Sequence, residues 1–450
     1  MIDDKVLFKL LNEAKKVLLF EPNYKRKYPP LGLMKLSTLA KLNGCEVEFT
    51  RQPKKTDADL ICVTTLFTYD HKITIDAVKT LQVVNPKAKM IIGGVAASVR
   101  KKDFSIGGAD VLSGYSEHLD LCYPDYSIDW MIDEKWIDWS FLFTTRGCPN
   151  SCGYCFVQKI EKELMVCKEW KKGIDISKRF AMVLDNNITA FGSDHINDVA
   201  NYFEKYNIKC CLDNAVDCKY INTESAKALS KIPIVKRGIR TAFDRIAEDG
   251  IFQESIETLI NSGISKYNIM AYVLFNYKDT PKEANYRAKE CVKLGIAPYP
   301  ARYKPINSLA RNIRYVSPKW TDRLAISFNH FWLMAGYYRK YDFEEYAKGE
   351  GKSRYKLTDE DWSYWNEENV ADSNGERLEG RSMSNGQSSR QLPFGESRET
   401  IQRKWESDPD VLRVAHGIPQ RMDRIRSLGN AIVPQVVVPI MQAIKTIEEI

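Results

Sequence analysis

Short apolar runs alternate with helix-like periods over the first part of the chain. Runs at 17–20, 47–49, 60–63 and 90–94 have the length and composition of buried strands, and amphipathic periods predict helices over 33–43 and 72–84. This alternation is typical of a doubly wound parallel sheet. Ligands bind beyond the carboxyl ends of the strands in such sheets, so the loops 21–31 and 93–98 are expected to share one edge.

The same alternation returns after residue 140. Six strand-like runs lie at 141–143, 181–187, 208–217, 236–244, 269–275 and 297–302, and helical periods lie at 193–206, 222–231, 251–262 and 280–294. Repeated strand–helix units favour a parallel barrel or part of one. We therefore expect an α/β chain whose second domain is a partial (β/α)6 barrel.

Two less regular parts complete the pattern. Aromatic residues with helical spacing over 319–346 predict a helical extension packed on the barrel, and stacking on single-stranded nucleic acid is the alternative. From about residue 368, Ser, Gly, Asn, Arg and Gln dominate, as in flexible linkers. The predicted domains are 1–125, 126–310, 311–365 and 366–450, and 126–140 is expected to be a connector with exposed aromatics.

Composition places the chain among ordinary water-soluble proteins. It has 450 residues, of which 44% are hydrophobic and 28% charged, and no apolar run reaches the roughly 18 residues of a membrane span. The first residues lack a signal-peptide pattern, and the eleven cysteines gather around one motif, so a reduced cytoplasmic setting is expected. The net charge of +7 permits nucleic-acid contact without favouring it, because basic and acidic residues are interleaved.

Three cysteines, Cys148, Cys152 and Cys155, fall within eight residues in a loop rich in Gly, Pro and Asn. Iron–sulfur clusters are normally held by four Cys thiolates, so a triplet predicts a cluster with one iron left for another ligand. A zinc site would need a fourth ligand at short spacing, but the next cysteine, Cys167, follows twelve residues later in a helix-like charged stretch. Incidental buried cysteines are the other alternative.

The spacing Cys-x3-Cys-x2-Cys with Tyr154 before the last cysteine resembles the signature of the radical S-adenosylmethionine (AdoMet) superfamily. The resemblance covers about residues 17–310, and 212–244 is also similar to a subgroup common in phage-associated sequences. It implies a [4Fe-4S] cluster on the three cysteines, AdoMet on the open iron, and an electron donor such as a flavodoxin or ferredoxin. Reductive cleavage of AdoMet would give a 5′-deoxyadenosyl radical that takes hydrogen from an unknown substrate; no catalytic residue is assigned.

Polar residues follow the predicted barrel strands where barrel chemistry gathers. We expect these residues and Tyr154 to bind the cofactor; those at the strand ends are Asp185, Asn186, Asn187, Asn214, Asp217, Arg240 and Asp244. The resemblance implies that 184–187 binds the AdoMet amino group. Arg240 is suited to a carboxylate because guanidinium binds carboxylates in a bidentate manner. Helix capping and turn formation are the alternative role for the Asp and Asn residues.

The order of Gly and Pro loops in 1–125 resembles the cobalamin-binding-type domain that precedes many radical AdoMet cores. The loop after the first strand lacks the histidine of cobalt-ligating relatives, since His71 and His118 lie elsewhere. This departure favours a retained fold with loss of cobalamin. Relatives that bind cobalamin without a histidine ligand keep cobalamin open as a cofactor.

The last 45 residues resemble the C-terminal end of DNA cytosine-5 methyltransferases, with Gly-Asn-Ala-x-x-Pro at 429–434. The nucleophile loop and the Gly-rich AdoMet loop of that family are missing, and a fragment of about 80 residues is too small for an independent catalytic domain. The tail is therefore interpreted as a fusion remnant. A component of a DNA (cytosine-5-)-methyltransferase is the alternative function, and a radical AdoMet enzyme is the favoured one.

Overall fold

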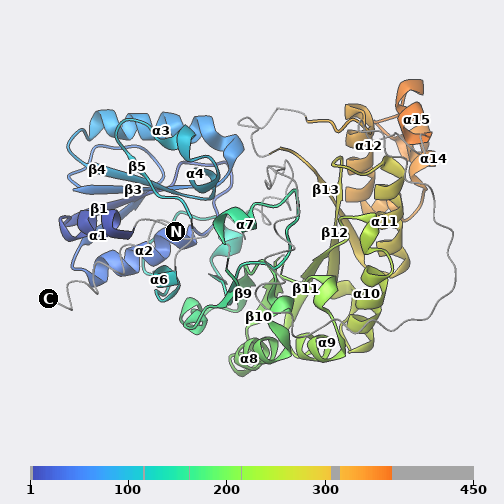
Figure 1. Ribbon diagram of the computed structural model, residues 1–450, viewed down its shortest axis with the longest axis horizontal. Coiled ribbons are helices and arrows are strands. Elements are labelled where there is room, and N and C mark those ends of the chain that lie inside the picture. Colours follow the sequence, from blue (N-terminus) through green and yellow to red (C-terminus); the bar gives the residue numbers. More distant parts are fainter. Residues whose placement is uncertain (1–3, 115–116, 162, 214, 306–314, 367–450) are drawn as a thin grey trace, which may run out of the picture.

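A computed structural model of the chain describes residues 4–114, 117–161, 163–213, 215–305 and 315–366. Two parallel sheets organise these residues, the first drawn in blue and the second in green and yellow in Figure 1. The predicted α/β class is confirmed. The tail predicted to resemble methyltransferases lies outside the described residues. Within the described ranges, no helix combines the length and apolar character needed to cross a membrane.

The first sheet has five parallel strands in the order β2-β1-β3-β4-β5. This is one of the two common strand orders of doubly wound folds. Four of its strands match the predicted runs, and the two-residue β5 was not predicted. The strands are β1 (Lys16–Phe20), β2 (Glu46–Thr50), β3 (Leu60–Thr65), β4 (Lys89–Gly94) and β5 (Asp110–Val111).

Helices cover both faces of this sheet (Figure 1). Val17 and Leu19 point to the face covered by α1 and α2, and Leu18 and Phe20 point to the face covered by α3 and α4. Burial on both faces explains why the strand reads as a continuous apolar run. The helices are α1 (Asp4–Asn12), α2 (Leu31–Leu42), α3 (His71–Val84), α4 (Val95–Val99), α5 (Lys101–Phe104) and α6 (Glu117–Asp120), with a 3-10 turn η1 (Thr68–Asp70).

The carboxyl edge of the first sheet is packed against the second domain. Tyr24 and Tyr28 from the loop after β1, Tyr69 after β3 and Val95 after β4 belong to the same apolar cluster as Phe141 of the second sheet. All five side chains are buried. The prediction that the loops after β1 and β4 share an edge is thus confirmed, and protein side chains fill that edge.

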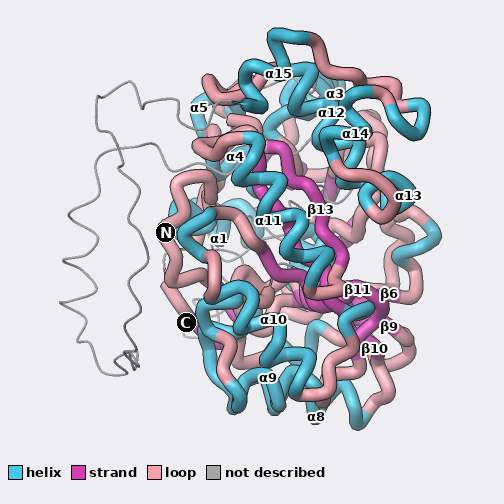
Figure 2. Tube along the Cα trace, turned by 90° about the vertical axis from the view of Figure 1, so that its right-hand side faces the viewer, coloured by secondary structure: helices cyan, strands magenta, loops and turns pink. Residues whose placement is uncertain are grey.

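The second sheet has six parallel strands in the order β13-β12-β11-β10-β9-β6, which follows the chain. Helices α8 to α11 succeed one another on one side of it (Figure 2). The strands are β6 (Trp139–Leu142), β9 (Phe180–Val183), β10 (Lys209–Leu212), β11 (Ile234–Ala242), β12 (Ile269–Phe275) and β13 (Ala297–Arg302). The helices are α8 (Gly192–Lys205), α9 (Thr223–Ser230), α10 (Ile251–Asn261) and α11 (Pro281–Lys293).

Short elements connect and close these strands. The antiparallel pair β7 (Thr145–Arg146) and β8 (Met165–Val166) and the single-turn α7 (Val157–Ile160) frame the cysteine loop. The 3-10 turns are η2 (Glu134–Trp136), η3 (Trp170–Gly173), η4 (Ile188–Phe191), η5 (Cys218–Tyr220), η6 (Ile246–Glu248) and η7 (Lys266–Asn268). Cys167 directly follows β8 and is buried, so the prediction of a helix-like stretch there is wrong.

Three strand predictions, 181–187, 208–217 and 236–244, ran past the last residue of the strand. β9 ends at Val183 and β10 at Leu212, so the polar residues after them lie in loops. The connector was also predicted wrongly, because Trp130 and Trp136 are buried at 4% and 6% exposure. Trp130 packs on Phe49 of the first domain, with ring centroids 4.7 Å apart. Trp136 contacts Tyr28 of the first domain and Phe141 of the second, so the connector fills space between the domains.

The aromatic stretch after β13 is a helical extension that packs on the second sheet. Trp320 and Phe328 contact Phe275 of β12 at ring centroid distances of 5.2 and 4.8 Å. Most of the aromatics are therefore core residues, as the packing interpretation predicts. The elements are α12 (Asp322–Leu333), α13 (Ala335–Tyr338), α14 (Phe343–Lys348), η8 (Glu350–Lys352) and α15 (Asp359–Asn366).

Candidate functional site

The cysteine loop joins β7 to α7 at the carboxyl side of the second sheet. Cys148, Cys152 and Cys155 are partly exposed, whereas the other eight of the eleven cysteines are buried, and none of the eleven forms a disulfide. A turn with a hydrogen bond from the Cys155 amide to the Cys152 carbonyl oxygen (2.9 Å) brings the last two cysteines together. The alternative of incidental buried cysteines does not fit these three.

All three cysteines line one pocket with about 870 Å³ of empty space, part of it open to solvent. The loop and the ends of β9, β10 and β11 meet here, as expected for parallel strands. The predicted residues that line it with the cysteines are Tyr154, Asn186, Asn187, Asp217, Arg240 and Asp244.

Two thiols of the motif, those of Cys148 and Cys152, are not activated as nucleophiles. Burial raises the pKa of Cys148 to about 11 and also raises the pKa of Cys152. A nucleophilic cysteine needs a lowered pKa, whereas a bound metal deprotonates its thiol ligands outright. The surroundings of Cys148 and Cys152 therefore disfavour a role as catalytic nucleophiles.

Among the described residues, no group of three or more His, Cys, Asp or Glu side chains is arranged to hold a single metal ion. Each thiolate of a cubane cluster binds a different iron, so its ligands stay farther apart than the ligands of one ion. Three partly exposed cysteines around one pocket fit such a cluster.

Asn187 connects the first cysteine to the end of β10. Its amide nitrogen lies 3.7 Å from the Cys148 sulfur and donates to Asp217 at 3.0 Å. Its side-chain oxygen accepts from the Ala190 amide at 3.1 Å and so caps η4. Asp217 likewise caps η5 by accepting from the Lys219 amide at 3.0 Å. Capping and pocket lining, which the sequence offered as alternatives, occur together in both residues.

Tyr154 and Asp244 meet on the opposite wall. The Tyr154 hydroxyl donates to the Asp244 carboxylate at 2.8 Å. Burial and the neighbouring carboxylate raise the pKa of Tyr154, so its phenol stays protonated and keeps this hydrogen bond. Asp244 also accepts from the Leu274 amide at 3.1 Å, which ties the wall to β12.

Arg240 lines the pocket, but its guanidinium already has a carboxylate partner. It forms an ion pair with Asp213, which follows β10 and is completely buried. Arg240 itself is 9% exposed. The pair therefore anchors β11 to β10, and a ligand carboxylate would share Arg240 with Asp213.

Asp185 is not among the described residues that line the pocket. Asp185 is fully buried and accepts from the amides of Thr144 and Thr145, at 2.6 and 3.1 Å, and from both hydroxyls. It therefore holds the segment that enters the cysteine loop, and its prediction as a cofactor ligand is corrected to a supporting position. Asn214 lies outside the described residues.

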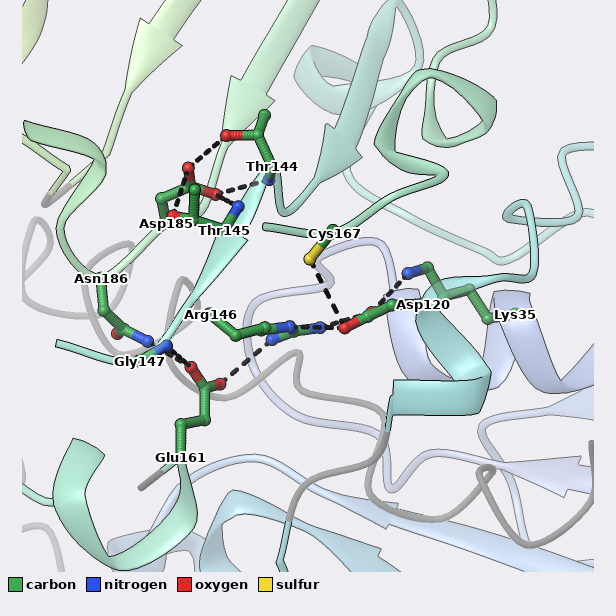
Figure 3. Close-up of polar contacts among 10 residues, drawn as sticks. All are labelled: Lys35, Asp120, Thr144, Thr145, Arg146, Gly147, Glu161, Cys167, Asp185 and Asn186. Carbon is green, nitrogen blue, oxygen red and sulfur yellow. Dashed lines mark hydrogen bonds and ion pairs between the residues drawn. The ribbon is translucent and has the colours of Figure 1, made fainter. Parts of the chain in front are cut away.

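A buried chain of charges lies directly behind the loop (Figure 3). Arg146 of β7 pairs with Asp120 through two 2.8 Å hydrogen bonds and with Glu161 at 3.1 Å, and Asp120 pairs with Lys35 at 2.8 Å. Burial opposes ionisation of Asp120, but Arg146 and Lys35 hold the pKa of its carboxyl well below the usual range. Nothing in the local sequence indicated this chain.

The sequence also did not predict several pocket residues. Lys219 and Glu248 form an ion pair at 3.4 Å on the rim, and Tyr272 of β12 lies deeper. Lys219 lies two residues after Asp217, in the loop that follows β10, so its position was a usable signal. Glu248 belongs to η6, and no periodic pattern connects it with the pocket.

Comparisons with known proteins identify no family. No protein-family model matches the chain, and no curated protein matches it. Structural matches include the carboxyl transferase domain of Rhizobium etli pyruvate carboxylase with 3-hydroxypyruvate, at 12% identity and a TM-score of 0.20, covering 70% of this chain. The same domain with oxamate and biotin matches at 12% identity and a TM-score of 0.19. The chain spans 44% of these structures, and a likeness this weak carries no argument.

Proposed function

We propose that the chain is a radical AdoMet enzyme that binds a [4Fe-4S] cluster on Cys148, Cys152 and Cys155. One observation carries the proposal: the three cysteines with the family's spacing line one pocket, and the other eight cysteines are buried. When bound, the cluster would supply one electron to AdoMet, breaking its sulfonium carbon–sulfur bond to give methionine and a 5′-deoxyadenosyl radical. The second domain would then be a partial (β/α)6 barrel of that family.

The chain's own residues would hold and orient AdoMet. Asn186 and Asp217 offer an amide and a carboxylate oxygen where the family binds the AdoMet amino group, and Asn187 adds an amide donor beside them. Asp244 also lines the pocket, and its hydrogen bond with Tyr154 would fix the loop between the second and third cysteine. Phe252 and Tyr272 add apolar walls that exclude water from a reactive intermediate.

Cobalamin has no role in this proposal, because the residues present do not fit it. A corrin ring would have to lie on the carboxyl edge of the first sheet. Tyr24, Tyr28 and Tyr69 already fill that edge, each at most 8% exposed.

The electron donor would be a small redox protein such as a flavodoxin or ferredoxin, and the substrate remains to be identified. A role in DNA cytosine methylation rests only on the sequence after residue 366. No described residue bears on that alternative.

Anaerobic reconstitution tests the proposal. The wild-type chain treated with iron and sulfide should turn brown and form 5′-deoxyadenosine from AdoMet on reduction. Replacing Cys148, Cys152 and Cys155 together by Ala should abolish both the charge-transfer absorbance and the product, because no thiolate ligand is left.

Cys218→Ala is the matched control, because Cys218 also lines the pocket but lies outside the motif. It should keep iron and activity, as should Ala at Cys167, Cys210 or Cys211. A triple variant that still binds a cluster and cleaves AdoMet, or a wild-type chain that takes up no iron, would overturn the proposal.

A further inference from the structure

Glu161, at the end of α7, is the common acceptor behind the cysteine loop (Figure 3). Its Oε2 atom accepts from the Gly147 amide at 2.9 Å and from the Asn186 side-chain amide at 2.6 Å. Its Oε1 atom accepts from Arg146 at 3.1 Å. Three donors converge on one side chain that is 2% exposed, and an ionised carboxylate can accept from all of them.

The three donors come from different parts of the site: the start of the cysteine loop, the pocket lining and the buried ion pair. Gly147 directly precedes the first cysteine, and Asn186 lines the pocket. Arg146 is completely buried, and its guanidinium lies 3.5 Å from the centre of the Phe143 ring. Glu161 therefore fixes the start of the cysteine loop and one pocket side chain through the same carboxylate.

The other side of Arg146 belongs to the first domain. Asp120 on α6 accepts from both Nε and Nη2 of Arg146, and Lys35 on α2 pairs with Asp120. Asp120 and Lys35 are each 5% exposed at their side chains. The chain Lys35–Asp120–Arg146–Glu161 thus runs from the first domain to the cysteine loop without reaching solvent.

We propose that Glu161 is a positioning residue for the cysteine loop and that the first domain, through Asp120, holds it in place. The first domain would then support the cluster site structurally and would not bind cobalamin. The part of this inference that concerns the cluster rests on the proposed function. The part that concerns the loop itself does not.

The physical reason is the cost of an unpaired buried charge. Loss of one partner from a buried ion pair is strongly destabilising, because the remaining charge stays out of water. Arg146 needs both Asp120 and Glu161, so the loop and the first domain are ordered together. Cluster potentials also respond to nearby charge, so removing a carboxylate charge here should raise the cluster's reduction potential.

The first experiment uses the chain without a cluster and measures alkylation of Cys148 by iodoacetamide, mapped by mass spectrometry. Glu161→Gln replaces one acceptor oxygen by an NH2 donor. In one orientation of the amide this donor faces Arg146, and in the other it faces the Gly147 and Asn186 donors. We expect the Cys148 rate to rise by about tenfold, because a charge-assisted hydrogen bond at the loop is lost. Glu163→Gln is the matched control, since Glu163 is an exposed carboxylate two residues away.

The second experiment uses the reconstituted chain and measures the midpoint potential of the cluster by EPR-monitored titration. Glu161→Gln and Asp120→Asn should each raise the potential, and Glu163→Gln should not. The two effects should be less than additive, because both variants act through Arg146. If Glu161→Gln does not fold, Asp120→Asn decides the question. The double variant Asp120→Asn with Lys35→Met is then made as well, because it removes the buried Lys35 charge that Asp120→Asn would leave without its partner.

The outcomes separate the two proposals. A wild-type chain that takes up no iron refutes the proposed function, while the alkylation rates still decide the positioning role. Alkylation rates and midpoint potentials that are the same in Glu161→Gln, Asp120→Asn and Glu163→Gln would overturn the positioning role, even if the cluster forms.

Discussion

At the level of single residues, Gly147 determines how the chain enters the cysteine loop. Its φ is +80°, a conformation that L side chains rarely adopt. A Cβ added there would lie 2.3 Å from the carbonyl oxygen of Glu163 on the neighbouring strand segment. The glycine is therefore required both by its backbone angle and by the close approach of another backbone.

We predict that Gly147→Ala lowers the unfolding free energy by about 3 kcal/mol and prevents iron uptake. The left-handed backbone costs an L residue roughly 1–2 kcal/mol, and displacing the Glu163 backbone adds a comparable amount. Gly263→Ala is the control, since Gly263 has φ +98° with open space at its Cβ. It should cost only about 1 kcal/mol and leave iron uptake intact. Equal costs in denaturant unfolding would mean that the close approach is unimportant.

Arg240 shows that a pocket residue can be hard to test alone. Asp213 beside it is completely buried, so Arg240→Ala would leave that carboxylate without its guanidinium partner. Removing one member of a buried pair costs roughly 3–5 kcal/mol. A loss of AdoMet binding in this variant would therefore report mainly on folding.

At the level of elements, the 3-10 turn η4 places Asn187 beside Cys148. One amide group performs two tasks, because its oxygen caps the turn and its nitrogen faces Cys148 and Asp217. The two tasks use different atoms, so substitutions can separate them. Ser keeps a capping oxygen but lacks the amide donor.

We predict that Asn187→Ser keeps the unfolding free energy within about 0.5 kcal/mol of wild type, while Asn187→Ala lowers it by about 1 kcal/mol. Both should weaken AdoMet binding by about tenfold, measured by equilibrium dialysis, because both lose the amide donor. Iron content should not change. If Asn187→Ser binds AdoMet as tightly as wild type, Asn187 is only a cap.

At the level of the whole molecule, the extension ends on a packed residue. Trp365 of α15 is 2% exposed, and its ring centroid lies 4.7 Å from that of Phe343. Asp361 of the same helix accepts from the Thr358 hydroxyl at 2.8 Å. The helix α15 therefore belongs to the folded unit, while the Ser- and Gly-rich composition after it is typical of a linker.

We predict that a chain shortened to end at Asn366 keeps the thermal stability, the cluster and AdoMet cleavage of the full chain. A chain ending at Leu357 is the control and should be destabilised by about 3 kcal/mol or more, because it loses the buried Trp365. The full chain should transfer no label from AdoMet to DNA. Labelled cytosine that depends on Asn430 would show that the tail takes part in methylation.

The sequence by itself determined the elements and the cysteine motif. Apolar runs in 17–20 and 269–275 are long enough to specify buried parallel strands, and local spacing alone brings Cys148, Cys152 and Cys155 into one loop. Asn187 and Asp217 were predictable because parallel strands end at a common edge. These are properties of short segments, so they can be predicted from the sequence without knowing the fold.

Only the tertiary structure decided which polar groups are buried together. Arg146 and Asp120 are 26 residues apart, and Asp185 meets Thr144 across 41 residues, so no local pattern reports either contact. The burial of Trp136 likewise depends on how two domains meet, because its ring contacts Tyr28 of the first and Phe141 of the second. Such contacts form because a buried charge or donor must find a partner wherever packing offers one, and packing is a property of the whole chain.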